Sequence, residues 1–331
     1  MVILIDPPAW PAHGTLWSHL VSDTSTDELH AFARLLGFPR RSFDLDHYDI
    51  SAANYDRAVA LGAIPVAGRE LVHRLRDAGL RVRQVDRDAI TPLRRRQYLV
   101  EQWAELGVQV GVDDAVPARA WERVGEEALA RWNEPHRSYH DERHLEDVLL
   151  ALDHLETRGE RISPVTLLAA WFHDAVYTGS AGDDERASAE LAVSALTGLG
   201  LDVALVEEVG ASIIATTPGG ADTQSESNPH PTGVNATRPV PALAHLLDAD
   251  LWIFASHPSR YAEYASAVRS EYAHVSDADF SMGRARILES YLNRPTLYFT
   301  GAARHLWESR ARANVAGEIA RLRGAHSEAP R

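Results

Sequence analysis

From about residue 97 onward the chain is a nearly unbroken series of amphipathic helical segments, and this pattern constrains the fold more than any other feature. The segment starts are marked: Ser163 precedes Pro164 as a capping residue, and Ser276 precedes a group of acidic residues. We therefore expect an all-helical domain over residues 99–323. The spacing of apolar residues predicts helices over 118–132, 141–157, 164–176, 184–198, 202–216, 241–254, 258–273, 278–292 and 302–323.

The N-terminal part has a different pattern. The apolar segment "MVILID" predicts a strand, and "STDELHAFARLLGF" predicts a helix that begins at Ser25 or Thr26. The segments "NYDRAVALGAIPV" and "GRELVHRLRDAGLRVRQV" are typical of a helix followed by a strand. We therefore expect a small α/β domain over residues 1–86 and a mainly α fold overall.

Three further segments carry composition signals. Residues 87–98 hold a proline and a run of charge, which favours a linker between the two domains. Residues 217–240 are rich in Gly, Pro, Ser, Thr and Asn, so we expect a flexible loop. Residues 324–331 are expected to form a disordered tail.

Composition excludes several kinds of chemistry. The chain has no cysteine, and all 33 basic residues are arginine, which excludes disulfides, thiolate ligands, Walker A loops and Schiff bases. It has no apolar run of about 18 residues and no signal-peptide pattern at its start, so we expect a cytoplasmic protein without a membrane partner. Residues 97–331 carry 20 arginines against 35 acidic residues, which argues against duplex nucleic acid and suits divalent cations.

Short segments of the helical part combine histidine and acidic residues with apolar neighbours: "SYHDERHLEDVL", "AAWFHDAVY", "GDDERAS" and "HLLDADLWIF". A His-Asp pair after the apolar run "LLAAWF" costs free energy on burial unless it is paired or bound to metal, and so do Asp248 and Asp250. Imidazole and carboxylate ligands suit Mn, Fe, Co, Ni or Zn, with Mg where carboxylates dominate. Each segment alone also fits a solvated helix face or an arginine pair, but their order on separate helices favours a metal site.

The order His, His-Asp, Asp resembles the HD superfamily of metal-dependent phosphohydrolases. The segments "EPHRSYHDERHLEDVL", "AAWFHDAVY", "LLDADLWIF" and "RYAEYASAVRSEYAHV" resemble its bacterial branch of largely uncharacterised members. The resemblance covers roughly residues 97–323 and implies an all-helical domain. It implies that the metal ligands are His144, His173, Asp174 and a late aspartate, for which Asp250, followed by Leu, matches the family pattern better than Asp248.

The segment "YHDERHLEDV" is also similar to a motif of cyclic-nucleotide phosphodiesterases, which are HD relatives. This resemblance implies that His144 binds metal and that His140 protonates the leaving oxygen. The chemistry is consistent, because a divalent metal lowers the pKa of bound water until hydroxide forms near neutral pH. Arg137 and Arg143 are candidates for phosphate contacts, or else surface arginines paired with acidic neighbours.

The chain departs from the family pattern in two places. Two-metal relatives often have His or Glu three residues after the His-Asp pair, where this chain has Tyr177. Between that pair and the last Asp the chain has only His230 and His245, which also argues against the di-iron oxygenases that share the fold. We expect one divalent metal ion; the acidic residues at 183–185 could hold a second ion or activate water, with Glu185 the catalytic candidate.

The N-terminal part resembles a small actinobacterial domain of unknown function that can precede HD domains. It carries histidines and acidic residues within 50 positions, which could form a second polar or metal site. The segment "DHYD" is equally typical of turn chemistry. The residues concerned are Asp6, His13, His19, Asp23, His30, Asp46, His47 and Asp49.

The combined pattern predicts a metal-dependent phosphoric ester hydrolase, either a phosphatase or a phosphodiesterase. Its expected substrate is a small phosphate ester, a nucleotide or a related metabolite. The alternative is a non-catalytic sensor that binds a nucleotide or metal in the same pocket. A homo-oligomer is compatible with the sequence.

Overall fold

A computed structural model describes most of the chain, with gaps at residues 1, 13, 113–116, 218–239 and 328–331. The described residues divide into two compact units. Unit 1 comprises Met1–Gln97 and Asp153–Glu160, and unit 2 comprises Tyr98–Leu152 and Arg161–Arg331.

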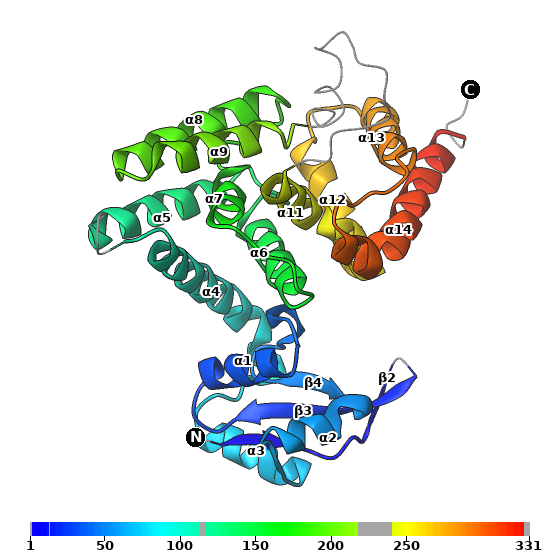
Figure 1. Ribbon diagram of the computed structural model, residues 1–331. Coiled ribbons are helices and arrows are strands. Elements are labelled where there is room, and N and C mark those ends of the chain that lie inside the picture. Colours follow the sequence, from blue (N-terminus) through cyan, green and yellow to red (C-terminus); the bar gives the residue numbers. More distant parts are fainter. Residues whose placement is uncertain (1, 13, 113–116, 218–239, 328–331) are drawn as a thin grey trace, which may run out of the picture. The chain divides into compact units, whose positions relative to one another are not determined.

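Unit 1 is a mixed α/β domain, as expected from the sequence (Figure 1). Its sheet has the order β2-β3-β1-β5, with β4 also paired to β3; all pairs are antiparallel except β1 with β5. The strands are β1 (Ile3–Ile5), β2 (Trp10–Ala12), β3 (Thr15–Ser22), β4 (Tyr48–Ser51) and β5 (Ile64–Pro65). The helices are α1 (Thr26–Leu35), α2 (Ala52–Ala60) and α3 (Gly68–Asp77), with short 3₁₀ turns η1 (Arg40–Ser42) and η2 (Gln84–Asp86).

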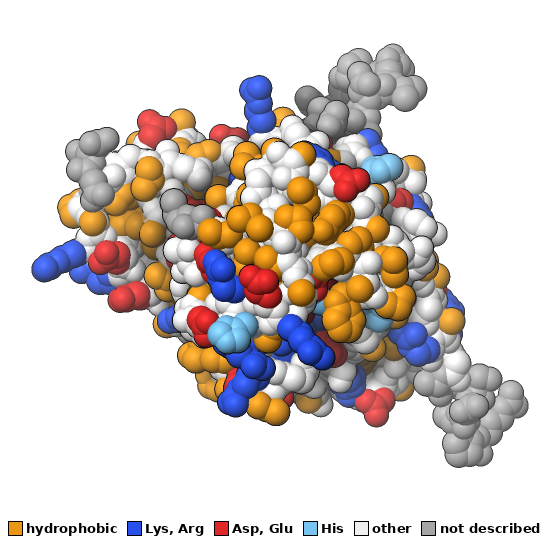
Figure 2. All heavy atoms as spheres, turned by 90° about the horizontal axis from the view of Figure 1, so that it is seen from below, with side chains coloured by type: hydrophobic (Ala, Val, Ile, Leu, Met, Phe, Trp, Pro, Cys, Tyr) orange, Lys and Arg blue, Asp and Glu red, His pale blue; other side chains and the backbone are white. Residues whose placement is uncertain are grey.

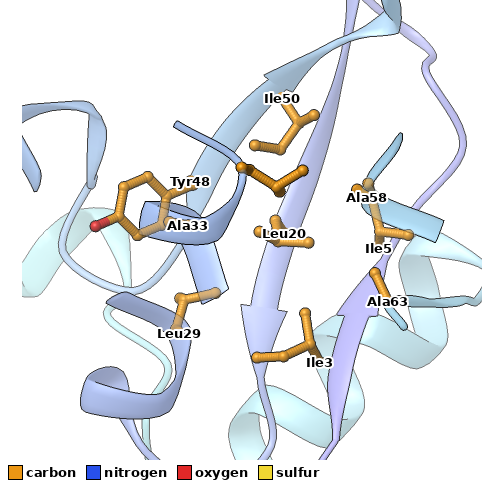
Figure 3. Packing of buried hydrophobic residues seen from close by; sticks show 10 residues of the cluster. Ile3, Ile5, Leu20, Leu29, Ala33, Tyr48, Ile50, Ala58 and Ala63 are labelled. Carbon is orange, nitrogen blue, oxygen red and sulfur yellow. The ribbon is translucent and has the colours of Figure 1, made fainter. Parts of the chain in front are cut away.

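The sheet buries apolar side chains on both faces, because successive strand residues point to opposite sides. Ile3 and Ile5 pack in one cluster with residues of α1 and α2, whereas Leu4 packs with residues of α3. Figure 3 shows the first cluster, with Leu20 of β3 at its centre. Each fully buried side chain of this size contributes about 1.5–3 kcal/mol, so the two clusters hold the three layers together.

One N-terminal expectation differs from the structure. The segment that follows α3 is not a strand, because the backbone N–H of Val82 donates to the carboxylate of Asp46 rather than to a neighbouring strand. The expected linker, residues 87–98, forms the first half of the helix α4 (Arg87–Gln109), whose Pro92 is tolerated within it. The two units divide between Gln97 and Tyr98, inside this helix.

Unit 2 is all helical, and every helix expected from the sequence is present in the described residues. Two helices, α4 and α6, contribute residues to both units. The helices after α4 are α5 (Ala118–Trp132), α6 (Glu142–Glu156), α7 (Pro164–Phe172), α8 (Asp183–Gly198), α9 (Val203–Ile214), α11 (Pro241–Asp250), the 3₁₀ helix η3 (Leu251–Ala255), α12 (Pro258–Glu271), α13 (Asp277–Leu292) and α14 (Gly301–Ser327).

Most residues of the expected loop and half of the expected tail lie outside the described part of the chain. Apart from its two end residues, the loop at 217–240 lies outside the described residues. The tail was expected to begin at 324, but α14 continues to Ser327, and residues 328–331 lie outside the described part of the chain.

A reciprocal pair of tryptophans joins α4 to α5. The rings of Trp103 and Trp121 stack with centroids 4.2 Å apart, and each indole N–H donates to the backbone carbonyl of the other residue at 2.9 Å. Each ring lies over a glycine: a Cβ on Gly107 would be 2.6 Å from Trp121, and one on Gly125 would be 2.4 Å from Trp103. The two glycines are thus required for the close approach of the helices.

The surface is mixed in character. Figure 2 shows apolar, arginine and acidic side chains interleaved on the face that it draws. Among the helices of the described ranges, none combines the length and the apolar character needed to cross a bilayer.

Candidate metal centre

Three helices bring the predicted ligands to one place in unit 2. His144 lies in the first turn of α6, and Asp250 is the last residue of α11. The apolar helix α7 (Pro164–Phe172) is capped by Ser163, whose side chain accepts from the backbone N–H of Thr166. His173 and Asp174 therefore follow the helix instead of lying inside it, although the sequence predicted a helix to residue 176.

The ligand atoms of His144, His173, Asp174 and Asp250 converge. The two imidazole Nε2 atoms are 3.2 Å apart. Asp250 Oδ1 lies 3.3 Å from Nε2 of His144 and 3.7 Å from Nε2 of His173. Asp174 Oδ2 lies 3.7 Å and 3.3 Å from the same two nitrogen atoms. His144, His173 and Asp174 also place all three ligand atoms within 4.8 Å of one another, so this group could hold a metal ion.

These separations suit one shared ion. Ligand atoms about 2.1 Å from a common ion, at angles of about 90–120°, are separated by about 3.0–3.7 Å. The described distances of 3.2–3.7 Å fall in this interval. The donor set of two imidazoles and two carboxylates is also one that divalent transition metals accept.

The two imidazoles are buried and oriented. His144 and His173 are each 1% exposed. Nδ1 of His173 lies 2.9 Å from the carbonyl oxygen of Ala170, which makes this nitrogen the donor and leaves the Nε2 lone pair directed at the carboxylates. Nδ1 of His144 is buried and has no hydrogen-bond partner among the described residues. Only His173 therefore has its tautomer set by a second contact.

The imidazoles and carboxylates of the cluster shift the pKa values of one another. Burial lowers the pKa of His173, but the carboxylates of Asp174 and Asp250 outweigh it and raise this pKa to about 9. Burial raises the pKa of Asp250, but hydrogen bonds from His144 and His173 more than offset it and hold that pKa well below its usual range. Protons and a divalent cation compete for the same atoms, so metal affinity falls as the pH falls.

His140 stands next to the cluster without joining it. Its Nε2 lies 3.9 Å from Asp174 Oδ2, and its Nδ1 lies 2.7 Å from Oε2 of Glu271, at the end of α12. The ring of Tyr177 stacks on the imidazole with centroids 4.0 Å apart. Burial lowers the pKa of His140, and the bond to Glu271 together with Asp174 raises it above the ordinary value.

Glu271 also holds the segment that carries His140. Its Oε1 accepts backbone N–H groups from Ser138, Tyr139 and His140 at 2.7–3.0 Å. One carboxylate from α12 therefore fixes both the backbone and the imidazole of the residue expected to donate a proton.

Arg137, expected to contact phosphate, is fully engaged by the protein. Its side chain is 0% exposed, and its guanidinium donates to the carbonyls of His140, Asp174 and Ala175 and to the carboxylate of Glu134. These contacts use all five N–H groups. Arg137 therefore joins the segment before α6 to the segment after α7. It has no N–H donor left for a substrate.

The other acidic candidates have local partners. Glu185 accepts the backbone N–H of Gly182 at the start of α8, and its catalytic role stays a prediction. Asp184 accepts three backbone N–H groups and a hydroxyl from residues 178–180. Asp248 accepts the N–H groups of residues 299 and 300, and Asp250 faces the imidazoles instead.

A cavity of about 410 Å³ opens beside the cluster. His173, Asp174 and Asp250 line one part of it, together with His140 and Glu185. Arg284 is the one arginine among the described lining residues. Seven aromatic side chains complete much of the wall: Tyr139, Tyr177, Phe254, Tyr264, Tyr272, Phe280 and Tyr291.

Sequence reasoning missed Glu271 and Arg284. Arg284 on α13 donates to Glu318 of α14 and to the hydroxyl of Tyr264, and among the described residues none accepts from its Nη1 group. Both side chains meet partners many residues away, so no local spacing in the sequence indicates them. The segment "RYAEYASAVRSEYAHV" contains Glu271 and Tyr264, and it was the only signal available.

The comparisons with known proteins concern unit 1. A family model described as a protein of unknown function (DUF4031) matches residues 3–78. This match confirms the expected likeness of the N-terminal part to a domain of unknown function. No curated protein matches the chain. Unit 2 lies outside the matched residues.

Proposed function

We propose that unit 2 is a metal-dependent phosphohydrolase of the HD type that acts on a small, nucleotide-like phosphate ester. The observation that carries the proposal is the convergence of His144, His173, Asp174 and Asp250, with ligand atoms 3.2–3.7 Å apart, beside a cavity. The resemblance of the same four residues to the HD ligand pattern supports it independently of the distances.

His140 has the position of a general acid. When bound, a divalent ion supplies Lewis acidity toward the phosphoryl group and toward water. The imidazole of His140 lines the cavity, with Nδ1 held by Glu271 and Nε2 on the side of Asp174. A proton on Nε2 can pass to the departing oxygen, and Glu271 fixes the ring while this happens.

The cavity lining favours a substrate with a phosphate and a flat ring. Arg284 is held at Nε and Nη2 by Glu318 and Tyr264, which leaves the Nη1 donors for an anion. The aromatic walls suit stacking of a base or similar ring. The volume of about 410 Å³ lies within the range of small-molecule sites, so a nucleotide-sized ligand is expected and duplex nucleic acid is not.

The activity test uses the full chain with Mn²⁺, Co²⁺, Ni²⁺ or Mg²⁺ and a panel of phosphate monoesters, diesters and nucleotides. Release of phosphate or nucleoside should be abolished by His173→Ala and by Asp174→Ala. His305→Ala, at an exposed position on α14, is the matched control and should keep full turnover. Nucleotide binding without turnover would establish the sensor in place of the enzyme.

A second experiment distinguishes the role of His140, which precedes α6, from that of His144 in the first turn of α6. His140→Gln should lower kcat by about 10²–10⁴-fold with metal content intact, because the proton donor is lost and the ligands remain. His144→Ala should lose the metal ion. Equal metal loss in both variants would make His140 a ligand, and loss of two iron ions with His144→Ala would point to a di-iron oxygenase.

A further inference from the structure

We propose that unit 1 contains a second, separate metal site, in which His19, His47 and Asp49 bind a divalent transition metal ion of the zinc class. This site is independent of the proposed phosphohydrolase centre, since all of its residues belong to unit 1. They also lie within the residues 3–78 that match the family of unknown function.

The sheet brings the three side chains together. His19 on β3 and Asp49 on β4 are direct partners in the antiparallel ladder, and His47 immediately precedes β4. Asp49 Oδ1 lies 3.6 Å from Nε2 of His47 and 4.0 Å from Nε2 of His19. The three ligand atoms lie within 4.8 Å of one another, and the imidazole centroids are 5.0 Å apart.

A buried carboxylate orients each imidazole from behind. Nδ1 of His19 lies 2.9 Å from Asp6 Oδ2, and Nδ1 of His47 lies 2.7 Å from Asp46 Oδ1. Asp6 and Asp46 are 4% and 2% exposed. A carboxylate at Nδ1 keeps the proton on that nitrogen, so both Nε2 lone pairs are available on the side of Asp49. Pairs of this kind, carboxylate to histidine to metal, are the usual support of metal-binding histidines.

The two supporting carboxylates are themselves fixed. Asp6 Oδ1 accepts the backbone N–H of His19, and Asp46 Oδ2 accepts the N–H of Val82 and a contact from Arg81. Asp49 differs, because its side chain is 51% exposed. It can therefore close the remaining distance to the imidazoles when a cation binds, since ligand atoms around one ion lie about 3.0–3.7 Å apart.

An ordinary surface ion pair looks different. On α3, His73 and Asp77 pair at 2.8 Å, but both side chains are well exposed and His73 has one carboxylate partner. His19 and His47 each have a carboxylate at both ring nitrogens. This arrangement orders two imidazoles around one shared point, which a simple charge pair does not need.

The donor set favours one class of ion and leaves coordination positions open. Two imidazoles and one carboxylate suit Zn²⁺, Co²⁺, Ni²⁺, Fe²⁺ or Mn²⁺ better than Ca²⁺ or Mg²⁺. Three protein ligands leave coordination positions for water or a small ligand. The half-exposed Asp49 and the 29% exposed side chain of His19 show that these positions are open to solvent.

The test measures metal content of the full chain after dialysis against Zn²⁺ and, separately, the visible absorption of the Co²⁺ form. To measure the unit 1 site alone, the experiment uses a His144→Ala/His173→Ala background, which removes both imidazole ligands of unit 2. In this background one equivalent of metal should remain. Adding Asp49→Asn should weaken the remaining binding by at least about 10-fold, and His47→Ala should abolish it.

Three further variants test the specificity of the metal binding. Asp77→Asn, the matched exposed pair on α3, should leave binding unchanged. Asp49→Asn in the otherwise native chain should weaken the binding of one equivalent to the same extent and leave the other equivalent and the melting temperature unchanged, so a failure to fold is recognised. Asp6→Asn, which keeps the acceptor for the backbone of His19, should weaken binding by about 10–100-fold.

Two results would overturn the site. One is that the background variant, with native circular dichroism, binds no Zn²⁺ or Co²⁺. The other is that binding persists in full when Asp49→Asn and His47→Ala are combined. Neither result touches the phosphohydrolase proposal, which depends on the residues removed in the background.

Discussion

The guanidinium of Arg137 makes five hydrogen bonds beside the candidate metal centre. It is fully buried and uses every donor to hold Glu134 and three backbone carbonyls. Lys offers three donors from one point and cannot reproduce this fork. We therefore expect Arg137→Lys to lower the free energy of unfolding by about 2–4 kcal/mol, since the backbone carbonyls and the Glu134 carboxylate lose hydrogen-bond donors.

Urea denaturation with steady-state kinetics checks the role of Arg137. A structural role predicts lower stability with little change of KM at temperatures where the variant stays folded. A raised KM with unchanged stability would restore the phosphate contact that the sequence suggested.

His30 makes unit 1 sensitive to acid. Burial, with smaller contributions from Arg40 and Arg94, lowers its pKa to about 3 from an ordinary value of 6.5, and Nδ1 contacts the hydroxyl of Tyr48 at 2.7 Å. The unfolded chain binds the proton more readily between these two values. Stability is therefore complete above pH 6.5 and falls as the pH falls toward 3, by about 2 kcal/mol at pH 5.

The free energy of unfolding, measured at pH 7 and at pH 5, tests whether stability falls as the pH falls. His30→Gln keeps a hydrogen-bonding group but cannot be protonated, so it should lose less stability between the two pH values than the native chain. His73→Gln, on an exposed part of α3, should behave like the native chain. An equal pH dependence in all three proteins would rule out His30 as the cause.

The sequence indicated the residues of the candidate metal centre better than the residues around them. His144, His173, Asp174 and Asp250 were named because imidazoles and acids beside apolar runs are costly unless they are used. Glu271 was missed because it meets His140 across 131 positions of sequence. In unit 1 the sequence named eight candidate residues without grouping them, and strand pairing selected which ones meet.

At the scale of elements, the stacked tryptophans make two glycines of α4 and α5 indispensable. Gly125→Ala would place a methyl group 2.4 Å from the ring of Trp103, and Gly107→Ala would place one 2.6 Å from Trp121. Neither ring can move without losing its N–H bond to the opposite backbone. We expect each substitution to lower the free energy of unfolding by about 1–3 kcal/mol.

Gly198→Ala in α8 is the matched control, because its added methyl group meets no atom within 4 Å. It should stabilise the protein slightly, by up to about 1 kcal/mol, through helix propensity. Thermal melts of the three variants decide the matter, and a Gly125→Ala variant as stable as the native chain would contradict the packing argument.

Helix ends were predictable where local chemistry sets them. α5 begins and ends at the expected residues, 118 and 132. α7 ends four residues early, because His173 and Asp174 turn toward partners on α6 and α11 that no local pattern reveals. The strand expected after α3 is replaced by a bond between Val82 and Asp46, a contact across 36 residues.

At the scale of the whole molecule, the chain divides into two compact units, and we expect them to unfold separately. Differential scanning calorimetry is expected to show more than one transition. Lowering the pH from 7 to 5 should shift mainly the transition of unit 1, through His30. Gly125→Ala should shift mainly the transition of unit 2. A single two-state transition that moves as one in both experiments would contradict this.

The stack of Trp103 on Trp121 has an optical consequence. Two parallel indoles 4.2 Å apart do not absorb light independently, because their excited states mix to an extent that depends steeply on separation and angle. The pairing of α4 with α5 thus has its own spectroscopic signature. The protein can report on the integrity of this helix pair without any attached dye.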